Sequence, residues 1–245
     1  MPWDFALILL ALAVLVPWRG AARVRQWLAL PRLSSMDRLA VYASTMALQW
    51  GVTALVAWRC YERGVGLQEL GLALPELEST VAAALILPLA LAWTQFASLR
   101  ALARQPRAKQ GFLGDMARKL LPQDTVEALA FSGLAVTVAL CEEFIYRGFA
   151  WAAIRGATGG SEWAALAGSS LLFGVAHAYQ GRRGIAVTAV AGLIFGGVRM
   201  WTGSLLAPMV AHLVADLVAG IAAPRLLRRA DAEARQAAAS TDITT

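Results

Sequence analysis

The sequence predicts an all-α fold, a polytopic transmembrane helical bundle of about seven spans. Of its 245 residues, 58% are hydrophobic and only 16% are charged, whereas a typical soluble domain carries about 25% charged residues. Long apolar stretches free of charge recur along the chain, and the basic residues fall between them rather than in one patch. That distribution favours membrane lipids as partners and gives no reason to expect a nucleic acid.

Seven apolar stretches are candidates for spans, and the first of them is the shortest. It contains Pro17, and its only charge is Asp4, while arginines follow it. We therefore expect an uncleaved anchor rather than a signal peptide, although this segment could also lie in the membrane interface. The stretches cover residues 3–18, 39–58, 80–99, 125–154, 163–180, 185–201 and 203–223.

The charges of the connections predict one orientation. Segments 19–38 and 100–119 are basic, and so is the region after residue 224, whereas segment 59–79 holds four Glu and two Arg. By the positive-inside rule the N-terminus lies outside and the C-terminus inside. The Arg- and Ala-rich composition suggests the inner membrane of a bacterium.

The chain divides into three parts. Residues 1–123 are expected to form N-terminal transmembrane helices and a cytoplasmic linker, residues 124–223 a helical core that carries the ionisable residues, and residues 224–245 a cytoplasmic basic tail that is partly disordered. Segment 64–75 is too polar to span and should lie at the interface. The two cysteines follow no metal-binding spacing and are interpreted as packing residues.

Three ionisable residues stand near the end of the fourth stretch. A charge at the centre of a membrane helix costs about 2.5–3.5 kcal/mol, so Glu142, Glu143 and Arg147 must pair or face a wet cavity. Glu143 and Arg147 are spaced i, i+4 and can pair. Glu142 is turned about 100° away and has no such partner. One carboxylate is then held in place and the other is available for chemistry, unless both are simply solvated at the interface.

The only two histidines, His177 and His212, both lie in or at the end of apolar stretches. A turn at residues 156–160 lies midway between Glu142 and His177, so an antiparallel hairpin places the two residues at the same depth. His212 follows the connection near residue 203 and lies about 15 Å into the membrane.

Two neighbours extend this group. Asp216 is one turn beyond His212 and Phe173 is one turn before His177, so each shares a face with its histidine. We expect Phe173 to form a wall of the site.

A glutamate and a histidine at one depth can activate a water molecule as a general base. A second histidine with a polar neighbour can stabilise an oxyanion. Two His and one carboxylate would also suffice for zinc, although the H-E-x-x-H pattern is absent. No cofactor is favoured, and zinc remains the alternative.

Three motifs resemble those of the CPBP family, which comprises type II CAAX prenyl endopeptidases and lysostaphin resistance protein A-like (Abi) proteins. The resemblance covers about residues 124–223. The motifs are E-E-x-x-x-R at Glu142 to Arg147, F-x-x-x-H at Phe173 to His177, and H-x-x-x-N/D at His212 to Asp216.

The resemblance implies an intramembrane endopeptidase with a glutamate-type mechanism, acting on a membrane-embedded or lipid-modified protein. Glu142 and His177 would activate water, His212 and Asp216 would form the oxyanion site, and Glu143 and Arg147 would support them. Asp216 departs from the prenyl-protease branch, which typically has Asn. Because an ionised Asp would repel an oxyanion, it must be protonated, act through His212 or have another role.

Two other functions remain as alternatives. The chain could be a non-catalytic bacteriocin-immunity or binding protein of the same fold. It could also be a proton or ion relay, because intramembrane Glu and His mark pumps as well. A relay needs ionisable groups at several depths, whereas these cluster at one level, which favours catalysis.

Overall fold

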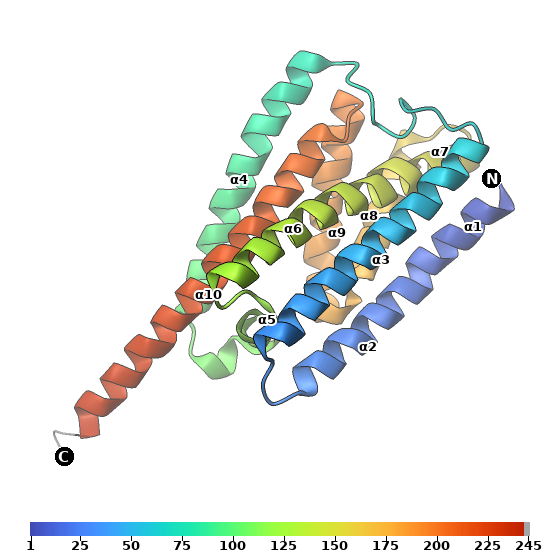
Figure 1. Ribbon diagram of the computed structural model, residues 1–245. Helices are drawn as coiled ribbons and strands as arrows, with labels where there is room; N and C mark the ends of the chain where they lie inside the picture. The colour runs from blue at the N-terminus through green and yellow to red at the C-terminus, as the bar shows by residue number, and fades with distance from the viewer. Residues whose placement is uncertain (243–245) are drawn as a thin grey trace.

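The computed structural model describes residues 1–242, and every element in this part of the chain is helical (Figure 1). The predicted all-α fold is therefore confirmed. The elements are α1 (Trp3–Leu10), η1 (Ala11–Leu15), α2 (Val16–Ala29), α3 (Ser35–Glu62), α4 (Leu77–Ala103), η2 (Arg107–Lys109), α5 (Gly111–Leu120), α6 (Thr125–Glu142), η3 (Glu143–Ala150), α7 (Trp151–Ala157), α8 (Glu162–Ala176), η4 (Ala178–Gln180), α9 (Gly181–Thr202) and α10 (Leu206–Asp242).

Six helices within residues 1–242 are long and apolar enough to cross a membrane, and α8 is a shorter apolar helix of 15 residues. Counting α8, the number agrees with the predicted bundle of about seven spans. The six are Trp3–Ala29, Ser35–Glu62, Leu77–Ala103, Thr125–Ala157, Ala178–Thr202 and Leu206–Gln236.

The first span is longer than the predicted residues 3–18. It continues without a break through η1, a turn of π-helix, and α2 to Ala29. Pro17 stands inside this continuous helix, directly after the π-helical turn, so its missing N–H removes one intrahelical hydrogen bond there. The buried Asp4 pairs with Arg59 at 2.6 Å and Arg63 at 3.0 Å, which ties the start of this span to the end of α3.

The fifth stretch ends earlier than predicted. Helix α8 stops at Ala176, and a single 3-10 turn leads into α9, which begins at Gly181 rather than at residue 185. Gly181 has φ 77°, a left-handed conformation in which a residue without Cβ avoids steric strain. His177 therefore caps α8 instead of lying inside a helix.

The last helix is also longer than predicted. Instead of a partly disordered tail from residue 224, α10 continues through Pro224 to Asp242. The sequence after residue 230 is rich in Ala, the best helix former, and Asp231 is held by Arg118 of α5 at 2.9 Å. Residues 243–245 belong to the predicted tail and lie outside the described residues.

The helices pack in pairs around α6 and α10. Helix α10 lies alongside α4 and also packs against α6, α6 packs against α3, and α8 packs against α9 (Figure 1). A Cβ on Gly192 would lie 3.0 Å from the Ser170 backbone, and one on Gly196 would lie 2.6 Å from Leu166. These two glycines of α9 therefore allow the close approach of α8.

Segment 64–75 closes the bundle at the end where α9 passes into α10. Arg199 donates to the carbonyl of Glu69 at 2.6 Å, and the N–H of Leu205 donates to the carbonyl of Gly71 at 2.8 Å. Leu70 is buried in the same core as η3. The segment is thus anchored to the core, beside the helices that carry the candidate site.

Candidate active site

The first motif lies where the fourth span changes its helical geometry. Glu142 is the last residue of α6, and Glu143 begins η3, a π-helix of eight residues that are all buried. A π-helix is rare and is frequently found at functional sites. It carries the Glu143–Arg147 pair into the interior of the bundle.

Glu143 connects the first motif with the third. Its Oε1 accepts a hydrogen bond from Arg147 Nη1 at 3.0 Å and lies 2.8 Å from Nδ1 of His212 on α10. Glu143 and Arg147 are fully buried and His212 is 7% exposed. The predicted pairing of Glu143 with Arg147 is confirmed. The contact with His212 joins residues far apart in the sequence, and no spacing rule predicts it.

Phe173 connects the second motif with both others. The Arg147 guanidinium carbon lies 4.0 Å from the centroid of its ring, a close cation–π contact. The same ring packs edge-on against His177 at 4.7 Å and against His212 at 5.9 Å. Phe173 thus lies between the two histidines, as expected for a wall of the site.

Glu142 is half-buried and has a partner that the sequence analysis missed. Its Oε1 accepts a hydrogen bond from Nε2 of Gln49 at 2.8 Å, a residue of α3. Its Oε2 has no hydrogen-bond partner among the described residues. In the sequence, Gln49 could have been singled out because it is a polar amide inside the apolar stretch 39–58. One oxygen of the carboxylate is thus held in place, while the other is buried and unpaired among the described residues.

His177 is also half-buried, and its tautomer follows from its surroundings. Its Nδ1 lies 2.8 Å from the carbonyl oxygen of Phe173. A carbonyl can only accept, so Nδ1 carries the hydrogen and Nε2 of the neutral ring is free to accept a proton. This is the arrangement required of a base.

Asp216 lies at the outer edge of the group. Its Oδ2 is 3.8 Å from Nε2 of His212, beyond hydrogen-bond distance, and its side chain is 34% exposed. His212 packs against Phe173, which also packs against His177, and it contacts Glu143, the neighbour of Glu142. The structure therefore brings the four predicted catalytic residues into one neighbourhood, although no hydrogen bond joins Glu142 to His177 among the described residues.

The site has two layers that differ in access. Glu143, Arg147 and His212 form a buried network, whereas Glu142, His177 and Asp216 remain partly open. The open residues can meet a reactant and the buried network can hold their surroundings in place.

The side chains of the site that could bind zinc are the two histidines and the nearby carboxylates. Within residues 1–242, no three His, Cys, Asp or Glu side chains gather as metal ligands would. Nδ1 of His212 is engaged by Glu143 and Nδ1 of His177 by a carbonyl, which leaves Nε2 as the available nitrogen of each ring. Both cysteines are buried and free.

Comparison with protein families supports the resemblance of the motifs. Residues 124–218 match the family model described as type II CAAX prenyl endopeptidase Rce1-like. The matched segment contains all three motifs, from Glu142 to Asp216. This match agrees with the CPBP family that the three motifs resemble. Together with the six helices of residues 1–242 that are long and apolar enough to cross a membrane, the match indicates an integral membrane protein. No curated protein and no solved structure matches the chain significantly.

Proposed function

We propose that this protein is an intramembrane endopeptidase of the CPBP type, which hydrolyses a peptide bond of a membrane-embedded or lipid-modified protein without a metal. The proposal rests on one observation: partly exposed residues of the site lie beside a buried network. The half-buried Glu142 and His177 each keep one atom free, while a buried network lies beside them. The family match adds that the segment resembles proteases.

In this mechanism a water molecule is activated between Glu142 and His177. The free Oε2 of Glu142 accepts a proton from the water as its oxygen attacks the carbonyl carbon of the substrate. Nε2 of His177 accepts a hydrogen bond from the same water and orients it. The proton then passes to the leaving amine as the C–N bond breaks, which restores the carboxylate.

The negative oxygen of the tetrahedral intermediate requires a donor, and we assign it to His212 with Asp216. A proton held on Nε2 of His212 or on the Asp216 carboxyl would supply that donor. Glu143 holds the other ring nitrogen at 2.8 Å, which fixes the orientation of the imidazole. Phe173 and Arg147 keep the ring from turning away.

The central test uses purified protein in lipid nanodiscs and a panel of membrane-anchored peptides, with products identified by mass spectrometry. Glu142→Gln and His177→Ala should each lower cleavage by roughly 10²–10⁴-fold, the contribution typical of general base catalysis. Glu78→Gln is the control, since it removes one exposed carboxylate from the first turn of α4. Cleavage that survives both site variants would contradict the assignment.

Two further arms separate the alternatives. A strong chelator should leave cleavage unchanged, whereas loss of cleavage that zinc restores would establish a metal mechanism. If no peptide is cut and Glu142→Gln still protects cells from a bacteriocin, the protein is an immunity or binding protein. Proton flux into vesicles that depends on Glu142 would indicate a relay.

A further inference from the structure

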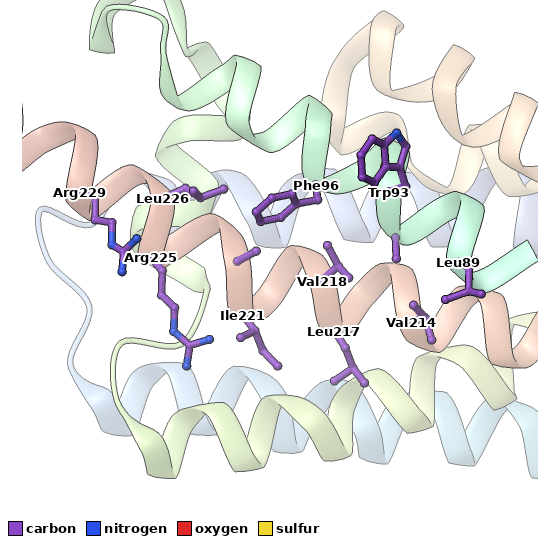
Figure 2. A pocket seen from close by; sticks show the side chains of 12 residues that line it. Leu89, Trp93, Phe96, Val214, Leu217, Val218, Ile221, Arg225, Leu226 and Arg229 are labelled. Carbon is purple, nitrogen blue, oxygen red and sulfur yellow. The ribbon is translucent and has the colours of Figure 1, made fainter.

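A long apolar groove runs between α4 and α10, away from the candidate site (Figure 2). The cavity has a volume of about 710 Å³. On α10 it is lined by Val214 and Val218, among others. Val218 is about 200° around the helix from Asp216, so the groove and the site occupy opposite faces of α10.

The walls of the groove are apolar and face outward. On α4, the side chains of Leu89, Trp93 and Phe96 are 72%, 79% and 40% exposed. On α10, the apolar part of the lining extends from Val214 to Leu226, which corresponds to about 18 Å of helix. This is close to the depth of one leaflet, about half of a hydrocarbon core about 30 Å thick.

One end of the groove is strongly basic. Arg225 and Arg229 lie there, beside Leu226 (Figure 2), and their i, i+4 spacing places them on the same face. On α4, Arg100 is one turn beyond Phe96, and its guanidinium carbon is 5.6 Å from that ring. This end of the molecule also carries α5 and the connection between α2 and α3 (Figure 1).

The two arginines of the groove have no partner within the part of the chain that the structure describes. Arg225 and Arg229 are exposed and form no hydrogen bond or ion pair with any other described residue. Their neighbour Arg228 donates to Gln123 at 3.0 Å, and the nearby Asp231 is taken by Arg118 at 2.9 Å. Two adjacent guanidinium groups are thus available to an anion at the end of an apolar groove.

We infer that this groove binds an anionic phospholipid, with an acyl chain along α4 and α10 and the phosphate between Arg225 and Arg229. Guanidinium groups bind phosphate through paired N–H donors, and basic residues beside a membrane helix attract anionic headgroups. A second copy of the chain fits this face poorly, since a two-fold contact would bring two arginine pairs together.

The test is native mass spectrometry of the full-length protein with phosphatidylglycerol and, separately, with phosphatidylcholine. The double variant Arg225→Gln/Arg229→Gln should bind phosphatidylglycerol on the order of tenfold more weakly. Arg228→Gln is the matched control, because it removes the same charge from the same turn and should bind as the wild type does. Equal binding of the two lipids, or no loss in the double variant, overturns the inference.

A second variant tests the groove itself. Val218→Trp fills the apolar part and leaves both arginines in place, so it should displace the acyl chain and weaken binding of phosphatidylglycerol. If it binds as the wild type does, the arginines attract lipid without a groove and the inference is wrong. The inference would also be wrong if the wild-type protein were a dimer and these variants were monomers, because a second copy of the chain would then occupy the groove. None of these residues belongs to the candidate active site, so peptide cleavage tests the proposed function separately.

Discussion

Gln49 is the residue of α3 that forms a hydrogen bond with Glu142, the candidate general base. Its amide donates to Oε1 of Glu142 at 2.8 Å and contacts no other motif residue. In a site with few hydrogen-bond donors, such a contact fixes the rotamer of the carboxylate and leaves the second oxygen free. We therefore interpret Gln49 as a positioning residue rather than a catalytic one.

Replacement of Gln49 should impair turnover without impairing binding. Gln49→Met keeps the length of the side chain but removes the donor, so kcat should fall about tenfold or more while KM stays near the wild-type value. Steady-state kinetics on a cleaved peptide would measure both. A rise in KM alone, with kcat unchanged, would show that Gln49 contacts the substrate instead.

Asp216 offers a second test at the scale of single residues. If the pair with His212 needs only a hydrogen-bond donor, Asp216→Asn should retain activity within a few fold, because an amide N–H can replace the carboxyl proton. Asp216→Leu removes the donor and should lower kcat by about 10²–10³-fold. An Asn variant as inactive as the Leu variant would indicate that a carboxyl proton is essential.

Contacts within one helix could be predicted from the sequence, whereas contacts between helices could not. Counting residues from the turn predicts depth, and the i, i+4 spacing predicts the pairing of Glu143 with Arg147. The contacts of Glu143 with His212 and of Glu142 with Gln49 depend on the rotation of one helix relative to another. Rotation is set by packing over the whole interface, which no single spacing encodes.

At the scale of elements, α3 and α6 are joined by a buried ion pair. Arg38 makes two hydrogen bonds of 2.7 Å to Glu127, which is fully buried and also accepts from the N–H of Gln123. This contact fixes the start of α6 and hence the rotation with which the helix delivers Glu142.

Removing one partner of this ion pair should destabilise the protein more than replacing both partners with apolar residues. Glu127→Ala leaves the arginine buried without its carboxylate and should cost about 3–5 kcal/mol, whereas Arg38→Met combined with Glu127→Leu should recover much of that loss. Equilibrium unfolding in mixed micelles measures both. Equal losses in the single and double variants would show that the pair itself supplies net stability.

The sequence predicted where helices lie better than where they end. Apolar content located each span, but the first helix continues through η1 and Pro17, and α8 stops at Ala176, where a 3-10 turn leads to Gly181. The extended part of α10 contains Asp231, which pairs with Arg118, a residue far away in sequence. Helix ends are set by capping and tertiary contacts, to which hydropathy is insensitive.

At the scale of the whole molecule, the basic segments gather at one end of the bundle. The connection between α2 and α3, α5 and the second half of α10 share this end, opposite to the N-terminus and α7 (Figure 1). This arrangement agrees with the alternation required by the predicted orientation, in which the basic end faces the cytoplasm.

Cysteine labelling in intact cells tests that orientation. Thr158 and Gln105 are exposed in connections at opposite ends of the bundle, and the native cysteines are buried. A membrane-impermeant maleimide should react with the Thr158→Cys variant in whole cells, but with the Gln105→Cys variant only after permeabilisation. The reverse pattern would invert the predicted topology.

The π-helix η3 has a further consequence for how this chain tolerates change. Each of its turns takes up about one residue more than an α-helical turn, so η3 acts like an insertion between α6 and α7. Deleting one residue between Glu143 and Trp151 would rotate everything after it by about 100°. Trp151, fully buried against Arg199, would then turn out of its place. In this stretch the number of residues is constrained as tightly as their identity, and relatives should vary here by substitution rather than by gaps.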